Sequence, residues 1–189
     1  MNKCIEQGYR ILFLDEVMFT YSTIHQLDYS AKGQHIVIPE KCLKGKTFAV
    51  IMAVSQEEGL EYYEIYEKSV NVDAFMEFLM CLRLRLIGQK VALFLDNLSV
   101  HHCKKVKSFC DKKDIPLIFN LAYSPEYNPI ENVFSLVKNR YKRDKHQSMV
   151  KLDHFDALKL VKKSIEDLND ETVKRICKAG MKKLIDLNA

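Results

Sequence analysis

The stretch Ser124-Pro125-Glu126-Tyr127-Asn128-Pro129-Ile130-Glu131 joins a proline-containing turn to the start of a helix. Pro129 suits the first helical position, Asn128 can cap the helix, and Glu131 can reach back to the cap, as in a capping box. The same turn would also present the Glu131 carboxylate in the first helical turn, where it could serve a site. The local sequence leaves both interpretations open.

Two further acidic residues each follow an apolar run that is typical of a buried strand. Asp15 follows Ile11-Leu12-Phe13-Leu14, and Asp96 follows Val91-Ala92-Leu93-Phe94-Leu95. In α/β sheets, sites form beyond the carboxyl ends of the strands. If the two strands are neighbours, a spacing of roughly 5 Å lets both carboxylates share a site with Glu131. Either aspartate alone could instead be an ordinary turn residue.

The pattern of the whole chain predicts a mixed α/β sheet with helices on its faces. We expect strands at 10–15, with an extended continuation at 18–24, and at 47–54, 60–67, 91–95 and 115–120; and helices at 72–87, 104–113 and 129–141, followed by two C-terminal helical patterns. Residues 25–46 are expected to form a long functional loop. We assign residues 1–145 to one domain and residues 146–189 to a C-terminal helical extension.

Three carboxylates at one point favour a divalent cation, because ionised carboxylates repel one another unless a positive charge separates them. Mg²⁺ prefers oxygen ligands, and two such ions about 3.5–4 Å apart can drive in-line phosphoryl displacement. The sequence has no Gly-x-x-x-x-Gly-Lys loop, so an ATPase has no support.

Composition indicates an intracellular protein without a membrane span. There is no apolar run of about 18 residues and no apolar core of a signal peptide near the N-terminus. We expect a location in the nucleus if the source is eukaryotic, and in the cytoplasm or nucleoid if it is bacterial. The six cysteines form no Cys-x-x-Cys pair, which favours free thiols in a reducing compartment.

Basic residues gather in one short segment, although the net charge is only +4. Lys138, Arg140, Lys142 and Arg143 suit a DNA phosphate backbone, and a solvated helix face is the alternative. His101 and His102 follow Asp96 closely. They are candidates for contacting a phosphate or, equally, for stabilising the loop after Asp96.

Three motifs resemble those of the Tc/mariner superfamily of DDE transposases and their bacterial insertion-sequence relatives. Phe13-Leu14-Asp15-Glu16 resembles the first, Leu93–His102 the second, and Tyr123–Glu131 the third. The 34 residues between Asp96 and Glu131 resemble the spacing of the glutamate-ending branch. Leu121-Ala122 departs from the proline pair that often precedes the third motif, a change expected to alter loop stiffness.

This resemblance implies an RNase H-like fold with strand order 3-2-1-4-5. It also implies Mg²⁺- or Mn²⁺-dependent strand cleavage followed by strand transfer, with Asp15, Asp96 and Glu131 as ligands of two ions. The implied partners are transposon-end and target DNA, in a homodimer or higher synaptic assembly. Because the chain begins almost at the first catalytic strand, we expect end recognition to come from a separate domain or subunit.

Two alternative functions share this fold. One is a domesticated or partial transposase that acts as a non-catalytic DNA-binding or assembly module, and the other is a nuclease. The intact set of three carboxylates favours catalysis, because a purely structural module needs no such set.

Overall fold

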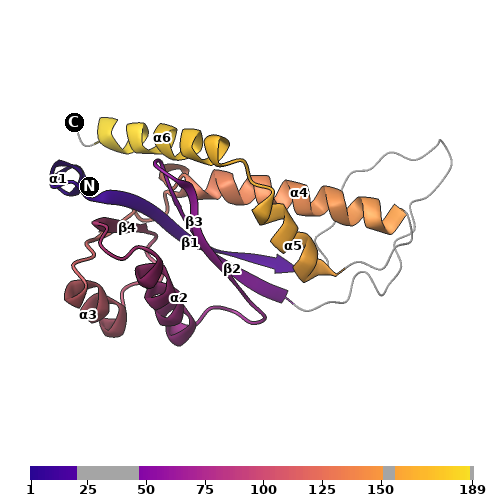
Figure 1. Cartoon of the computed structure of the whole chain (residues 1–189), viewed down its shortest axis with the longest axis horizontal. Helices are drawn as coiled ribbons and strands as arrows, with labels where there is room; N and C mark the ends of the chain where they lie inside the picture. Colours follow the sequence, from indigo (N-terminus) through magenta and orange to yellow (C-terminus); the bar gives the residue numbers. More distant parts are fainter. Residues whose placement is uncertain (21–46, 151–155, 188–189) are drawn as a thin grey trace.

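A computed structural model describes residues 1–20, 47–150 and 156–187, and its centre is a five-stranded sheet (Figure 1). The strand order is β3-β2-β1-β4-β5, which confirms the order expected from the sequence. The strands are β1 (Arg10–Thr20), β2 (Thr47–Ser55), β3 (Gly59–Tyr66), β4 (Val91–Leu95) and β5 (Leu117–Phe119).

The sheet is mixed, with β1 at its centre. β1 pairs antiparallel with β2 and parallel with β4, while β3 continues the antiparallel side and β5 the parallel side. β2 is buried along nearly its whole length, which explains its continuous apolar sequence. β3 lies at one edge of the sheet and carries Glu61 and Glu64 among its aromatic residues.

Helices cover both faces of the sheet (Figure 1). α2 (Val72–Arg85) and α3 (Lys104–Lys112) pack on one face. α4 (Ile130–Val150), α5 (Ala157–Glu166) and α6 (Asp170–Asp186) pack on the other. The short α1 (Asn2–Glu6) precedes β1, and the 3-10 turn η2 (Pro125–Tyr127) precedes α4.

Two elements extend further than their sequence patterns indicated. β1 continues to Thr20, so Asp15 lies inside the strand and not at its end. Every second residue from 13 to 19 lies on the same face of β1, namely Phe13, Asp15, Val17 and Phe19. The pairing of β1 with β2 continues to Thr20.

α4 continues to Val150, beyond the expected end at residue 141, because Tyr141 and Lys145 are both buried along its length. The domain boundary assigned after residue 145 therefore falls within α4, and α5 and α6 share the core of the sheet. That division of the chain stays a prediction. The expected loop at residues 25–46 lies outside the described residues.

Within the described ranges, Cys4, Cys81, Cys103, Cys110 and Cys177 are free thiols, and Cys42 lies outside them. None of the helices in those ranges combines the length and apolar character needed to cross a membrane.

α6 contacts the start of β3 and the turn that begins α4. Near its start, the Asp170 carboxylate accepts a hydrogen bond from the Leu60 amide at 3.2 Å, beside Gly59. Further along, Gly180 packs directly on Pro129: a Cβ added at Gly180 would lie 2.6 Å from the Pro129 Cβ. Glycine inside a helix costs about 1 kcal/mol relative to alanine, and this close approach is a reason for its presence.

Gly180→Ala is expected to destabilise the protein by about 1–2 kcal/mol, because the overpacking penalty exceeds the gain in helix propensity. Chemical denaturation monitored by circular dichroism measures the change. In a Pro129→Gly background the contacting ring is absent, so the same substitution should cost nothing. A stabilising Gly180→Ala in the wild-type background would contradict this account of the contact.

Candidate active site

Asp15, Asp96 and Glu131 line one pocket of about 410 Å³ at the middle of the sheet's length. They come from β1, from the residue after β4, and from the first turn of α4. The rest of the lining comes from two loops: Asn97, Leu98, Asn120, Leu121, Ala122, Tyr123, Ser124, Pro125 and Asn128. The structure therefore brings together all three carboxylates that the sequence singled out.

The pairing of β1 with β4 explains why the two aspartates meet. Phe13 lies opposite Phe94, and β4 ends at Leu95 while β1 continues. Extending this parallel register by two residues puts Asp96 level with Asp15, on strands about 4.8 Å apart. Because β4 ends at Leu95, it does not continue beside β1 past Asp15, and the pocket lies at that place.

Asp15 is buried, with 6% of its surface exposed. Its Oδ1 accepts a hydrogen bond from the Glu16 amide at 2.8 Å, and its Oδ2 accepts one from Asn128 Nδ2 at 2.9 Å. Burial, reinforced by the negative charge of Asp96, raises the pKa of Asp15 to about 8. Asp15 therefore holds a proton at neutral pH while no cation is bound.

Asn128 does not form the capping box that its sequence suggests. Its side chain points to Asp15, and its backbone amide donates to the Pro125 carbonyl at 2.9 Å. Its Oδ1 is buried and has no hydrogen-bond partner among the described residues. Glu131 is exposed. The capping interpretation is wrong, because the Asn128 side chain forms a hydrogen bond with Asp15, which is distant in sequence. The local sequence pattern does not reveal such a contact.

Asp96 is half-exposed and is held by His101. The His101 Nδ1 lies 2.8 Å from Asp96 Oδ1, and the Leu98 amide donates to the same oxygen at 3.1 Å. Burial acts to raise the pKa of Asp96, but these contacts outweigh it and the pKa is lowered. Asp96 is therefore ionised at neutral pH.

His101 is fully buried and lies between two carboxylates. Its Nε2 is 3.3 Å from Glu16 Oε2, and its ring packs on Phe75 with centroids 4.6 Å apart. Burial acts to lower the pKa of His101, but Asp96 and Glu16 together raise it to about 10. The suggestion that His101 contacts DNA does not fit this position, because the ring is inaccessible; it orients Asp96 instead.

The other residues suggested for DNA binding lie at the surface. His102 stacks on Phe119, with ring centroids 4.1 Å apart. On α4, Arg140 donates to the Asp167 carbonyl, and Arg143 lies 3.3 Å from Asp144. Lys138 and Lys142, on the same helix, are half-buried.

The three carboxylates share a pocket without being closed around one point. Among the described residues, no three His, Cys, Asp or Glu side chains are gathered closely enough to hold a single metal ion. Asp15 accepts a hydrogen bond from Asn128, and Asp96 is paired with His101.

Comparison with known proteins identifies the family. A family model described as the DDE superfamily endonuclease matches residues 10–153. The chain belongs to this family. A search of curated proteins found no match.

Solved structures of Mos1 transposase share the fold of this chain. A pre-cleavage Mos1 transpososome superposes with a TM-score of 0.67 at 19% identity, covering 94% of this chain and 55% of that one. A paired-end complex with the left transposon end gives 0.66 at 20%, covering 94% and 56%. The catalytic domain of Mos1 mariner transposase gives 0.57 at 16%, covering 94% and 84%.

These matches confirm the RNase H-like fold and the resemblance to a mariner catalytic domain. The chain spans little more than half of the longer Mos1 chains. It spans most of the Mos1 catalytic domain.

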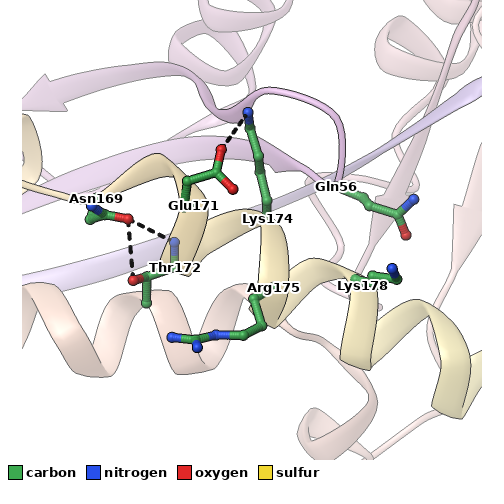
Figure 2. Close-up of a pocket in the computed structure, with 7 residues that line it drawn as sticks. All are labelled: Gln56, Asn169, Glu171, Thr172, Lys174, Arg175 and Lys178. Carbon is green, nitrogen blue, oxygen red and sulfur yellow. Dashed lines mark hydrogen bonds and ion pairs between the residues drawn. The ribbon is translucent and has the colours of Figure 1, made fainter.

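A second cavity, about 710 Å³, lies beside α6 and the turn between β2 and β3 (Figure 2). Lys174, Arg175 and Lys178 line it with Gln56, Asn169, Glu171 and Thr172. Lys174 is paired with Glu171 at 3.1 Å, and Arg175 points away from Lys174 in this view. The cations do not converge, so this cavity lacks the focused chemistry of the carboxylate pocket.

The raised pKa of His101 predicts how the stability of the metal-free protein depends on pH. Its pKa is higher in the folded state, about 10, than the ordinary value of 6.5. Its stabilisation is therefore full below about pH 6.5 and is lost as the pH rises towards 10. His101→Asn cannot carry the charge, so the wild-type advantage in unfolding free energy should shrink across this window. Urea denaturation in a chelator, at a series of pH values, measures it.

The contribution of Asp15 to the unfolding free energy also falls with rising pH, between about pH 4 and 8, because the pKa of Asp15 is raised in the folded state too. That change occurs in both proteins and cancels from their difference. A difference between wild type and His101→Asn that is constant from pH 6 to 10 would show that His101 carries no charge in the folded state.

Proposed function

We propose that this chain is the catalytic domain of a DDE transposase that cleaves DNA strands and joins them to a target, with divalent metal ions. Asp15, Asp96 and Glu131 would hold Mg²⁺ or Mn²⁺, with two ions in the active complex. When bound, such ions activate the attacking oxygen and stabilise the leaving one during in-line phosphoryl displacement.

The observation that carries this proposal is the convergence of the three carboxylates on one pocket from three separate elements. The donors fit a hard cation, because all three are oxygen ligands of the kind that Mg²⁺ prefers. The buried Oδ1 of Asn128, in the same pocket, lacks a hydrogen-bond partner among the described residues. A buried acceptor of this kind is costly unless a cation or a water molecule satisfies it.

The surrounding residues prepare the carboxylates differently. His101 keeps Asp96 ionised and oriented, so this carboxylate offers charge at neutral pH. Asp15 holds a proton in its buried position and releases it when a cation offsets the burial penalty. Asn128 and the Glu16 amide fix the direction of both Asp15 oxygens. Glu131 is exposed and free to turn towards the pocket from the first turn of α4.

DNA is the partner that we propose for this site. Mos1 transposase was solved with Mn and with Mg, in paired-end complexes and in a strand transfer complex. By analogy, we propose that this chain acts in a homodimer or higher synaptic assembly. Recognition of transposon ends is proposed to reside in a separate domain or subunit.

Nicking of supercoiled plasmid in Mn²⁺ tests the catalytic proposal. Asp96→Asn should lower the nicking rate by about a hundredfold or more, because it removes a charged ligand. Asp111→Asn, the same substitution at an exposed position on α3, is the matched control and should nick at the wild-type rate.

Wild-type protein that neither binds Mn²⁺ in calorimetry nor nicks DNA would leave the non-catalytic module as the remaining function. Products are also assayed for joining to a target molecule. Cleaved ends without joined products would identify a nuclease.

Lys138 and Lys142 are expected to contact DNA phosphates from α4. Replacing both with alanine should reduce the slope of log affinity against log salt by about 2, one phosphate contact for each residue. Fluorescence anisotropy with a duplex oligonucleotide over a salt series measures it. Replacing Lys182 and Lys183, which are exposed on α6, provides a control of equal charge. An unchanged slope would mean that the α4 lysines form only a solvated face.

A further inference from the structure

Tyr123 adopts a backbone conformation that aromatic residues rarely take. Its φ is +56°, and among the described residues only Asp114 shares a positive φ without being glycine. Aspartate tolerates this left-handed region, whereas a bulky side chain is disfavoured there. A glycine at position 123 would fit the same turn without strain. The fold therefore tolerates a cost to keep an aromatic ring at this position.

The ring contributes nothing to the protein core. Tyr123 has a relative exposure of 103%, the largest among the exposed apolar and aromatic side chains of the described residues. Strained residues that persist without a packing role are a reason to look for a functional one. The Tyr123 ring is therefore available for contact with a ligand that approaches from solvent.

Hydrogen bonds from two asparagines fix the loop that carries the ring. Asn120 Nδ2 donates to the Ser124 carbonyl at 2.7 Å, and Asn120 Oδ1 accepts from the Leu121 amide at 2.8 Å. Asn97 Nδ2 donates to the Asn120 carbonyl at 2.7 Å. Asn97 follows Asp96 directly, so the position of Tyr123 is tied to that of the carboxylate.

Three exposed apolar or aromatic side chains are among the residues that line the carboxylate pocket. Leu98, Leu121 and Tyr123 all line it, and all three are exposed, at 47%, 55% and 103%. We call these three residues the apolar rim. With divalent cations held at the floor of carboxylates, as in the proposed function, the apolar rim suits a ligand with an uncharged planar part and a separate anionic part. A nucleotide has this shape, with its base on the rim and its phosphate nearer the floor.

We propose that the apolar rim binds an unstacked base of the DNA strand whose phosphate lies at the carboxylates, with the Tyr123 ring as the stacking surface. This inference rests on the proposed function. Base–aromatic stacking tolerates any base sequence, because every base has a π-face. A pocket of about 410 Å³ is in the range of small-ligand sites, so it has room for a nucleotide.

The test compares three substitutions at one position. Tyr123→Phe keeps the ring, Tyr123→Ala removes it, and Tyr123→Gly removes both the ring and the backbone strain. The probe is a duplex with a short single-stranded end that carries the fluorescent base 2-aminopurine. Anisotropy in Mn²⁺ gives the affinity, quenching of 2-aminopurine reports stacking, and cleavage is quantified in the same samples.

Tyr123→Ala and Tyr123→Gly are expected to weaken binding about tenfold and to abolish the quenching, whereas Tyr123→Phe stays within about twofold of wild type. Tyr123→Gly should also melt at a higher temperature than Tyr123→Ala, which shows that its weaker binding is not a folding defect. An abasic nucleotide in place of the fluorescent base should weaken wild-type binding equally, with no further loss in Tyr123→Ala.

Three results would overturn the inference. One is wild-type affinity and quenching in Tyr123→Ala, and another is a loss in Tyr123→Phe as large as in Tyr123→Ala. The third is a change of oligomeric state in Tyr123→Ala by analytical ultracentrifugation, which would make the rim a contact between copies of the chain. If wild type cleaves DNA while Tyr123→Ala matches it, only this inference fails. Absence of wild-type cleavage and metal binding would instead defeat the proposed function.

Discussion

The hydrogen bond from Asn128 to Asp15 joins the centre of the sheet to the turn that begins α4. It links residues 113 positions apart in sequence, and both partners are buried. Because it fixes the turn over the sheet, it also fixes where Glu131 leaves α4 and where the loop before η2 closes the pocket. Gly180 supports the same turn from the other side through Pro129. This buried contact and the packing behind it therefore place Asp15 and Glu131 relative to each other, while His101 holds Asp96.

Patterns with a clear physical period were sufficient to predict most of the fold. The apolar runs at β2 and β4 are buried strands, and Asn71 caps α2 as an asparagine at that position should, by accepting from the Ala74 amide. The continuation of β1 past Asp15 was also encoded, because Phe13, Val17 and Phe19 keep the alternation around the aspartate. The three carboxylates were found from their places after strands and at a helix start, supported by a family resemblance.

Contacts between distant residues were beyond prediction from sequence. Asn128 has the local pattern of a cap, yet a buried acceptor from β1 takes its side chain. His101 and His102 are adjacent, but one is fully buried between carboxylates and the other is exposed on Phe119. Lys145 belongs to a basic segment whose sequence is typical of a protein surface. It is nevertheless only 1% exposed, on a helix, α4, that packs against α5. In each case the environment comes from another element of the fold, which no local period encodes.

The edge strand β3 limits how two copies of the chain can associate. An unpaired strand edge offers amides and carbonyls to any other strand, and charged side chains are a common defence. β3 contains Glu61 and Glu64 and no basic residue. In a continuous sheet formed by two β3 edges, the half-buried Glu64 of each copy would enter the new ladder with no basic residue of β3 to offset it, whereas Glu61 is already paired with Arg10 at 3.2 Å. This charge disfavours the pairing of two β3 edges in one sheet.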